Sequence, residues 1–226
     1  DLVRSRGLGD VYKRQGPCAR ALVEAGVKRV VYSTADPNKA AAGGAAYLRD
    51  HGVEVDFQPV RVAALQPWLR SVRHGRPSVT LKFASTLDGF TAAADGTSQW
   101  ITGEAAREQV HEDRTKIDAI IVGTGTAITD DPSLTARFPD GTLRQHQPRR
   151  VVIGSREVPE GNLSRLGLEQ YATPHEALDA LWHTGARDVL VEGGATLAAS
   201  FLELDLVDTV PVSYTHLRAH ETVLDL

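Results

Sequence analysis

The chain has 226 residues, of which 42% are hydrophobic and 24% are charged, and its formal net charge is −4. These fractions are typical of a soluble globular protein, and the negative charge argues against a nucleic-acid-binding protein. No apolar run approaches the length of a membrane span, so no membrane-spanning segment is expected. The single Cys excludes an internal disulfide framework and fits a cytoplasmic protein.

The two ends of the chain are expected to lie outside the native protein. Residues 1–15 and 211–226 contain SRGLGDVYKRQ and VSYTHLRAHET, which resemble translated sequencing-adapter DNA, and the chain has no Met. Pro211 cannot donate to a sheet ladder, so we expect it to end the apparent strand over 206–210. Ordinary exposed tails are the alternative. The native part is then 16–210, which is enough for one or two domains.

Strands and helices alternate along this native part. Strands are predicted over Arg29–Ser33, Val53–Phe57, Ser78–Ala84, Ala119–Val122, Arg150–Ile153 and Val189–Val191. Helices are predicted over Ala19–Ala25, Ala40–His51, Val62–Val72, Glu104–Lys116, His175–Thr184 and Thr196–Leu204. This alternation predicts an α/β fold with a largely parallel sheet, whose ligands lie beyond the carboxyl ends of the strands. The loops to search are those that follow Ala84, Val122, Ile153 and Val191.

Two of these loops are rich in glycine. In VLVEGGATLAASFL, Gly193 and Gly194 lie between a strand and a helix, where the backbone can approach a ligand and free helix N–H groups can receive a phosphate. In IVGTGTA, which begins at Ile121, the Thr126 hydroxyl and the backbone near Gly125 could hold a phosphate or a ribose. A tight turn is the alternative for this second segment.

Polar side chains in the same loops are candidates for ligand contacts. The run Asp130-Asp131-Pro132 could bind a ribose or a polarised ring, or form an ordinary turn. Glu192 ends a buried strand, where a carboxylate can bind substrate hydroxyls or amines. Ser155, beside Arg156, could meet the 2′-phosphate of NADP, or lie in a polar turn. Trp100 could stack on a cofactor ring or fill the core.

Arg114 is expected on the buried side of its helix. It shares a helical stripe with Ala106, Val110 and Ile117, and that stripe should face the core. A guanidinium in such a place needs an anionic partner. A substrate phosphate and an internal carboxylate both satisfy that need, and the sequence leaves the two alternatives open.

From Pro77 to Val210 the chain resembles the reductase domain of the bifunctional riboflavin-biosynthesis deaminase/reductase family. The matching segments occur in order: LKFASTLDG, GTSQWIT, the helix ending at Arg114, GTGTAITDDPSLTAR, VVIGS and VEGGATLAASFL. The resemblance implies a dihydrofolate-reductase-like fold in a homo-oligomeric enzyme. It also implies NADPH-dependent reduction of the ribose of 5-amino-6-(5-phosphoribosylamino)uracil to a ribityl chain.

The resemblance further implies the site residues. The NADPH contacts would be Ser85, Trp100, Thr126, Asp130, Ser155, Gly194, Ala195, Thr196, Leu197, Ala198, Ala199 and Ser200. The substrate contacts would be Ser98, Arg114, Leu134, Arg137 and Glu192. Arg114 and Arg137 would bind the ribose 5-phosphate, and Glu192 would orient the sugar or the pyrimidine.

The upstream segment GPCARALVEAGVKRVVYSTADPN resembles the end of the same family's zinc deaminase domain, with Cys18 as the last zinc ligand. A zinc deaminase needs a His, two Cys and a Glu in a His-x-Glu motif, and the chain has neither that motif nor a second Cys. Residues 16–76 are therefore expected to be an inactive deaminase remnant with a linker helix, and zinc is expected in the full-length parent only. Residues 77–210 would be a reductase domain that lacks its last strands.

Two other functions remain open at this stage. The chain could be another dihydrofolate-reductase-like enzyme that reduces a pyrimidine or a pterin, although a pterin has no phosphate for Arg114 and Arg137. It could also be a folded, non-catalytic fragment that binds a nucleotide or a partner. Either enzyme would act on a small molecule, and no alternative involves nucleic acid or a membrane.

Overall fold

The computed structural model describes residues 18–38, 42–86, 89 and 104–214. The chain divides into two units, 1–77 and 78–226, and each is described by itself. The predicted ligand contacts Ser98 and Trp100 lie outside the described residues. Among the helices of the described part, none is long and apolar enough to cross a membrane.

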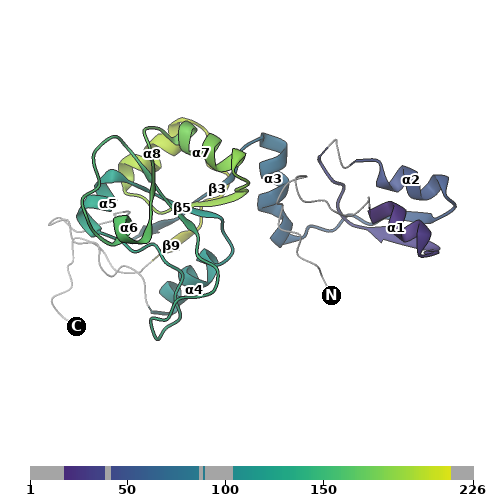
Figure 1. The fold of residues 1–226 in the computed structure, drawn as a ribbon, viewed down its shortest axis with the longest axis horizontal. Coiled ribbons are helices and arrows are strands. Elements are labelled where there is room, and N and C mark those ends of the chain that lie inside the picture. Colours follow the sequence, from purple (N-terminus) through teal and green to yellow (C-terminus); the bar gives the residue numbers. More distant parts are fainter. Residues whose placement is uncertain (1–17, 39–41, 87–88, 90–103, 215–226) are drawn as a thin grey trace. The chain divides into compact units, whose positions relative to one another are not determined.

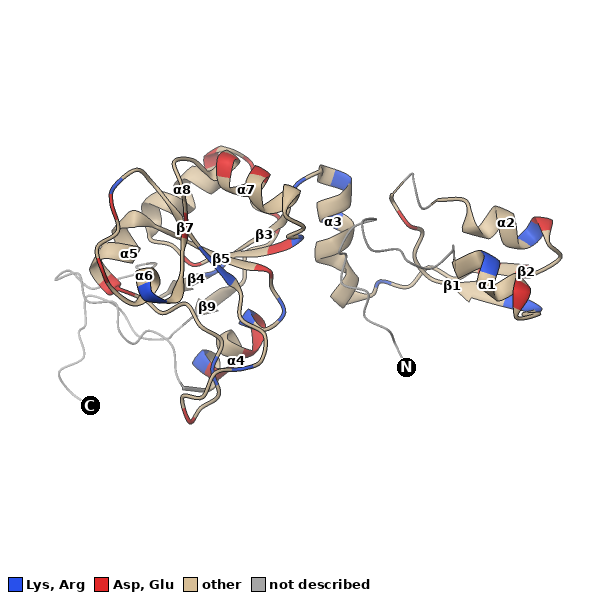
Figure 2. Cartoon of the chain, in the orientation of Figure 1, with Lys and Arg blue, Asp and Glu red and all other residues tan. Residues whose placement is uncertain are grey.

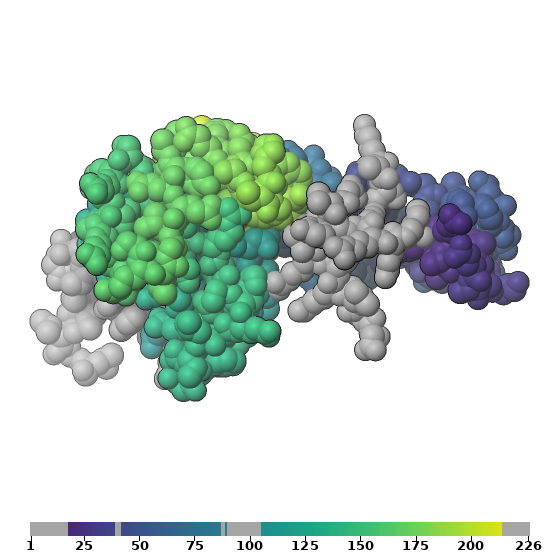
Figure 3. Space-filling view, in the orientation of Figure 1, coloured from purple at the N-terminus to yellow at the C-terminus, as the bar shows by residue number. Residues whose placement is uncertain are grey.

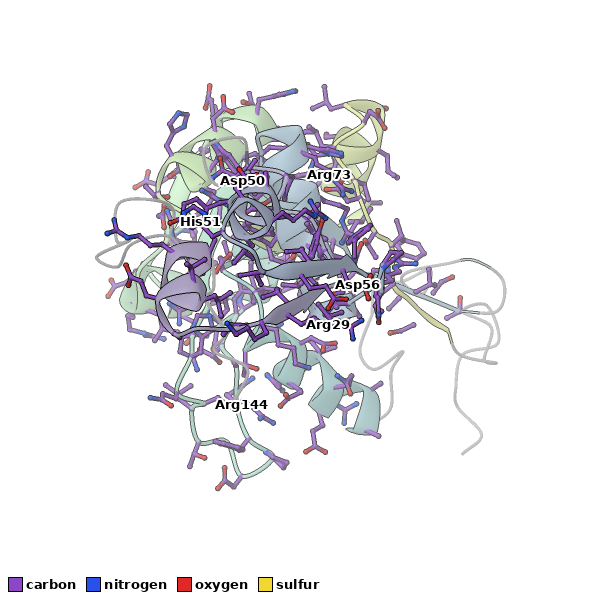
Figure 4. The ribbon with its side chains drawn as sticks, turned by 90° about the vertical axis from the view of Figure 1, so that its right-hand side faces the viewer. Arg29, Asp50, His51, Asp56, Arg73 and Arg144 are labelled. Atoms are coloured by element: carbon purple, nitrogen blue, oxygen red, sulfur yellow. The ribbon has the colours of Figure 1, made fainter. Side chains whose placement is uncertain are left out.

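The first unit is a small α/β layer. Its parallel strands are β1 (Arg29–Tyr32) and β2 (Glu54–Phe57), and its helices are α1 (Cys18–Glu24), α2 (Gly44–Asp50), the short 3-10 helix η2 (Ala63–Leu65) and α3 (Gln66–His74). Ala19, Leu48 and Val53 form its buried cluster. Figure 4 shows Arg29 and Asp56 side by side on the two strands, where their side chains pair at 3.2 Å. Both side chains are exposed, so this ion pair contributes little stability.

The second helix is shorter than the sequence predicts. The expected helix over 40–51 begins only at Gly44, because Gly43 takes a left-handed conformation with φ +99° and acts as the N-cap. A glycine pair inside a helical pattern lowers the free-energy cost of ending the helix there. The predicted C-terminal end is confirmed, since Gly52 has φ +77° and its N–H donates to the Arg49 carbonyl.

The second unit is built on a five-stranded sheet in which every pairing is parallel (Figure 1). The strand order is β3 (Ser78–Leu81), β8 (Asp188–Val191), β5 (Ala119–Gly123), β6 (Arg149–Ile153) and β7 (Glu169–Tyr171). The predicted α/β fold with a parallel sheet is therefore confirmed. In the space-filling view, the teal and green residues of this unit form one continuous body (Figure 3).

Helices cover both faces of this sheet. On one face, α7 (Pro174–His183) and α8 (Ala195–Glu203) bury residues such as Leu181 and Phe201 against Ile121 and Val191. On the other face, α5 (Thr124–Asp130) and α6 (Asn162–Leu166) pack against a second cluster that includes Ile120 and Val122. Successive strand residues thus enter opposite layers, and β5 is apolar throughout because both of its faces are buried.

The strand predicted over 78–84 is broken in two. β3 pairs with β8, whereas β4 (Phe83–Ser85) pairs with β9 (Val212–Tyr214). The change occurs at Lys82, whose N–H still donates to the Val191 carbonyl at 3.0 Å. A local break of this kind turns the strand toward a new partner. The hydrophobic pattern of the sequence does not change at the break, so the sequence does not predict it.

Residues 211–226 are expected to lie outside the native protein, yet residues 212–214 form the strand β9 in the structure. The Pro211 carbonyl accepts a hydrogen bond from the Phe83 N–H at 3.1 Å, so the proline pairs through the group that it retains. The predicted strand over 206–210 is reduced to a single bridge between Thr209 and Thr80. The adapter origin of 211–226 stays a prediction, because strand pairing does not test it.

The short elements α6 and β7 are also absent from the elements predicted from the sequence. β7 has the sequence Glu-Gln-Tyr, which lacks an apolar alternation, and its place depends on a partner 20 residues away. Arg149 of β6 binds both carboxylate oxygens of Glu169 at 2.7 and 2.6 Å, and Tyr171 donates to the same carboxylate at 2.9 Å. The Arg149 hydrogen bond lowers the pKa of Glu169. Side-chain pairing, rather than strand propensity, fixes this edge of the sheet.

The central layer between the sheet and α7 should dominate the stability of the second unit. Leu181 is fully buried there, so Leu181→Ala should lower the free energy of unfolding by about 3 kcal/mol through lost transfer energy and a new cavity. Leu202, which is 56% exposed, is the matched control, and Leu202→Ala should cost little. Urea denaturation of both variants measures the difference. Equal losses would contradict this account of the core.

Candidate functional site

The sheet places two central strands at a topological switch point. β5 lies between β8 and β6, and the chain leaves β5 through α5 toward β6 while β8 lies on the opposite side. Open α/β sheets bind ligands at such a point, beyond the carboxyl ends of the strands. Gly123 ends β5, and Glu192 follows β8 with its N–H donating to the Ile121 carbonyl at 2.9 Å.

A cavity of about 320 Å³ opens at this switch point. Its lining residues are Gly123, Gly125, Thr126, Thr129, Asp130, Gly194, Thr196 and Leu197. The first five come from the end of β5 and from α5, and the last three come from the start of α8. The structure therefore brings together two segments that the sequence analysis selected separately, in a cavity large enough for part of a nucleotide.

The segment after β5 is helical, not a turn. The sequence analysis expected a glycine-rich turn within 121–127, but α5 starts at Thr124 directly after Gly123. Gly and Thr are poor helix formers, so their sequence favours a turn. Burial of Thr124 and Ala127 against the sheet compensates for that low propensity. As a result, Thr126 lies in the first turn of a helix and lines the cavity.

The two aspartates that end α5 have different roles. Asp130 lines the cavity, as the ligand-binding interpretation requires. Asp131 instead accepts the Asn162 N–H at 2.7 Å at the start of α6, and Gly161 packs tightly against its carboxylate. Asp131 is therefore a structural residue that holds α6, and only Asp130 remains a candidate for ligand contact.

The helix α8 divides its residues between the cavity and the core. Gly194, Thr196 and Leu197 line the cavity, whereas Ala198 packs into the core cluster. The cavity lining does not include the remaining predicted contacts of this run, Ala195, Ala199 and Ser200. The N–H groups in the first turn of α8 point toward the cavity end of the helix, and no side chain caps them.

Gly193 is required by packing. A Cβ atom at this position would lie 2.7 Å from Leu197 Cδ2 and 3.0 Å from Leu197 Cβ, which is closer than side-chain atoms can approach. At Gly194 the nearest atom to such a Cβ would be Thr126 Oγ1, at 3.7 Å. The first glycine thus lets α8 pack on the sheet, and the second leaves the cavity open.

The loop after β6 lies against the start of α5. A Cβ atom on Gly154, which has φ +131°, would lie 2.7 Å from Thr124 Oγ1, and Arg156 Nη2 lies 3.5 Å from the position of a Cβ on Gly125. Gln170 of β7 fixes this loop, because its amide donates to the carbonyls of Gly154 and Arg156 at 2.7 and 2.8 Å. Arg156 is therefore held beside the cavity.

Two predicted cofactor contacts lie apart from the cavity lining. Ser155 is exposed in the loop that carries Arg156. Ser85 is 5% exposed at the end of β4, and its hydroxyl donates to the Thr86 carbonyl at 3.0 Å. Neither residue lines the cavity in the described part of the chain.

Arg114 pairs with Glu192. Arg114 Nη2 lies 2.6 Å from Glu192 Oε2, Arg114 Nε lies 3.4 Å from Oε1, and the two side chains are only 12% and 13% exposed. Arg114 Nη1 also donates to the Thr135 carbonyl at 2.9 Å. The prediction of a buried guanidinium with an anionic partner is confirmed. Of the two partners left open, the structure contains the internal carboxylate, and that carboxylate is itself a predicted substrate contact.

The other substrate-side residues lie on the segment that follows Asp131. The Leu134 side chain is 4% exposed in the core and has φ +49°, so only its backbone can face a ligand. Arg137 is exposed, and it is held by an antiparallel bridge to Leu143. Arg144 supports the same loop by pairing with Glu112 of α4 (Glu104–Arg114) at 2.7 Å, and Figure 4 shows it beside that helix.

His111 is not among the site residues predicted from the sequence. His111 precedes Arg114 by one helical turn on α4, and its Nδ1 lies 3.0 Å from the Thr135 carbonyl. Figure 2 shows basic and acidic residues interleaved along this helix, so composition alone does not distinguish His111 from its neighbours. Its spacing of three from Arg114 is the one signal that places both side chains on the same face.

Cys18 does not fit a zinc site. It is exposed at the start of α1 and contributes to a second cavity of about 340 Å³ with Leu22, Tyr32 and Asp36. Within the described residues, no group of three or more His, Cys, Asp or Glu could hold a metal ion. One thiolate is too few for catalytic zinc.

These features define the class of protein as an α/β protein with a ligand cavity at its switch point. Residues 77–215 match the family of the RibD C-terminal domain. The riboflavin biosynthesis protein RibD of Corynebacterium ammoniagenes is 60% identical over 207 residues, which cover 88% of this chain and 61% of that protein. RibD of Mycobacterium tuberculosis is 45% identical over 208 residues, with the same coverage of both chains.

Solved structures agree with these sequence relationships. Acinetobacter baumannii RibD superposes with a TM-score of 0.75 at 35% identity and covers 95% of this chain and 70% of its own. A deaminase/5-amino-6-(5-phosphoribosylamino)uracil reductase of Thermotoga maritima superposes with a TM-score of 0.73 at 28% identity and the same coverage. The chain therefore belongs to the RibD family. It spans about 61% of the length of the curated relatives named above.

The glycine pair offers a test of the site's construction. Gly193→Ala should destabilise the protein by about 2 kcal/mol, because Leu197 must move away from the added methyl group. Gly194→Ala is the matched control and should melt close to the unmodified protein, since the nearest atom to the added methyl group would be Thr126 Oγ1 at an ordinary contact distance of 3.7 Å. Thermal unfolding of the two variants measures the difference. A similar melting temperature for both would rule out the packing role of Gly193.

The Arg114–Glu192 pair should contribute to folding stability. Arg114→Met should lower the free energy of unfolding by about 3 kcal/mol, because it leaves the Glu192 carboxylate buried without its cation. Adding Glu192→Gln should recover part of that loss, since the neutral amide costs less to bury. Lys116→Met, which removes exposed ion pairs from the same segment, is the control and should cost about 0.5 kcal/mol. Denaturant unfolding of Arg114→Met, Glu192→Gln, the double variant and the control gives the coupling energy, and strictly additive losses would show that the pair is not coupled.

Proposed function

We propose that the chain is the reductase part of a RibD protein and reduces the ribose of 5-amino-6-(5-phosphoribosylamino)uracil to a ribityl chain with NADPH. The observation that carries this proposal is the cavity at the switch point. Its wall includes Gly194, which is two residues after Glu192 of the Arg114–Glu192 pair in the sequence. A cavity that can hold part of a nucleotide, with a polar pair close to it along the chain, is what a reductase of a phosphorylated sugar requires, since cofactor and substrate must meet.

The residues of the cavity fit a dinucleotide. Gly123, Gly125 and Gly194 present backbone where side chains would obstruct a bound phosphate, and the uncapped start of α8 supplies N–H donors. Thr126 and Asp130 offer a hydroxyl and a carboxylate for a ribose. When bound, NADPH would supply the hydride for the reduction.

The substrate side fits a phosphorylated sugar. Arg114 uses three of its five N–H groups for Glu192 and Thr135, so two remain for a substrate phosphate. Arg137 is exposed on a braced loop and adds a second positive charge. Glu192 neutralises the charge of the Arg114 guanidinium, so the positive charge of Arg137 remains for the phosphate. This fit favours the phosphoribosyl substrate over a pterin, which has no phosphate.

The proposal extends to the rest of the chain. We expect the second unit to be a dihydrofolate-reductase-like domain that lacks its last native strands, with residues 16–76 as a remnant of the deaminase domain and its linker. Because Cys18 lacks partner ligands in the described residues, this remnant should neither hold zinc nor deaminate. We expect the full-length parent to be a cytoplasmic homo-oligomer with zinc in its intact deaminase domain.

The direct test is cofactor oxidation by the purified chain with the phosphoribosylamino-uracil substrate. Loss of absorbance by NADPH, with a ribityl product identified by mass spectrometry, is the expected result. NADPH binding without turnover would favour the non-catalytic nucleotide-binding alternative. Turnover of a pterin in place of the phosphoribosyl compound would favour the other reductase.

Arg156 should set the preference for NADPH over NADH. Its guanidinium lies beside Gly125 and can bind a 2′-phosphate, so Arg156→Leu should weaken NADPH binding by more than about tenfold and leave NADH binding unchanged. Arg165→Leu, which changes an exposed residue of α6, is the charge-matched control and should change neither affinity. Calorimetric titration of both cofactors measures the four affinities. Equal affinity of the unmodified chain for the two cofactors would remove this loop from the cofactor site.

A further inference from the structure

We propose that His111 is a positioning residue of the substrate site, which fixes the segment from Leu134 to Arg137 on α4 through the Thr135 carbonyl. This inference rests on the proposed function, because the segment it fixes carries Arg137 and borders Arg114. His111 itself need not touch the substrate. Its role is to hold in place the backbone on which the phosphate-binding charges depend.

The Thr135 carbonyl accepts two hydrogen bonds from one face of α4. His111 Nδ1 lies 3.0 Å from the oxygen, and Arg114 Nη1 lies 2.9 Å from it. A carbonyl has two lone pairs, so these donors saturate it. Arg114 also holds Glu192, and the carbonyl therefore connects α4, the loop after Asp131 and the end of β8. Removing the His111 donor leaves only the Arg114 bond on this oxygen and so weakens the attachment of the loop to the helix at a point next to Arg114.

The backbone at this point requires support. Leu134 is a non-glycine residue with φ +49°, a conformation that persists only where the surroundings impose it. Its side chain is anchored in the core on one side, and the next carbonyl is held by α4 on the other. Beyond it, the Ala136 N–H donates to Gln147 Oε1 at 2.9 Å. The His111 hydrogen bond therefore completes the contacts that fix the backbone leading to Arg137.

The hydrogen bond also fixes the tautomer of the ring. A carbonyl only accepts, so Nδ1 must carry the proton, and in the neutral ring Nε2 is then unprotonated. The charged groups that face the ring are Arg114 of the same helix, Arg137 of the loop and Glu192 after β8. Burial and then the Arg114 charge lower the pKa of His111, the Thr135 hydrogen bond opposes them in part, and the Arg137 and Glu192 charges act in opposite directions with smaller effect. The neutral ring is thus the form that the site stabilises.

This lowered pKa gives a pH dependence of known sign. The folded protein holds the His111 proton less tightly than the unfolded chain, whose ordinary pKa is 6.5. The stabilising contribution is therefore complete above pH 6.5 and is lost as the pH falls toward the lower folded pKa. His111→Asn, which cannot titrate, should lack this component of the acid destabilisation.

The test compares two replacements of His111 in the 226-residue chain. His111→Phe keeps a ring but removes the donor, and it should raise the KM for the phosphoribosyl substrate by about tenfold with an unchanged KM for NADPH. His111→Asn places an amide N–H near Nδ1 and should restore most of the substrate KM. His146→Phe is the matched control, because His146 Nε2 makes the same kind of bond to the Ile117 carbonyl at 2.9 Å. It should leave both constants unchanged.

A second readout does not depend on turnover. The Nε–H of Arg114 reports on the ion pair with Glu192 in a proton–nitrogen NMR spectrum. We expect faster exchange of that proton in His111→Phe than in His111→Asn or His146→Phe. If the unmodified chain reduces nothing, the proposed function fails, and this spectrum still decides the role of His111. Unchanged exchange in His111→Phe, or a substrate KM equal to that of the unmodified chain, would overturn the inference.

Discussion

The parallel pairing of β5 with β8 is the constraint on which the rest of the second unit depends. The register aligns Ile121 with Val191, so β8 ends beside β5, which continues to Gly123, and both strands lead into glycine-containing helix starts. Neither helix start forms a cavity alone. β5 and β8 are neighbours, and the helices that follow them cover opposite faces of the sheet. The starts of α5 and α8 therefore each form one wall of the same cavity. Burial of both apolar faces of β5 removes the strand from water and stabilises this arrangement.

The Arg114–Glu192 pair extends that constraint to the substrate side. Glu192 directly follows β8, so the position of its carboxylate is set by the strand, and Arg114 brings the end of α4 to it. A buried ion pair contributes little net stability compared with apolar residues of similar size, but it strongly penalises arrangements in which either charge is alone. The pair therefore favours one position of α4 relative to the sheet. The position of α4 also fixes the loop that carries Arg137, because the Thr135 carbonyl accepts hydrogen bonds from that helix.

The sequence predicted those parts of the fold whose signal is local. The buried strands of the sheet read as continuous apolar runs, and the rule for their carboxyl ends brought Thr126, Asp130 and Gly194 to one site. Local propensity failed where tertiary contacts decide. Burial turns the GTGTA segment into a helix, and short polar strands such as β7 and β9 exist only through their partners. The partner of Arg114 lies 78 residues away, and no pattern of spacing could select it from the other acids.

The contact of Gly193 with Leu197 has a consequence for how this site can diversify. Leu197 belongs to the core cluster and also forms part of the cavity wall, so its size affects packing and ligand space together. A larger residue at position 193 is compatible with the helix only if position 197 becomes smaller, and the cavity would then widen. The two positions should therefore covary among related sequences. Lineages that alter this pair would change the shape of the pocket without altering a polar contact.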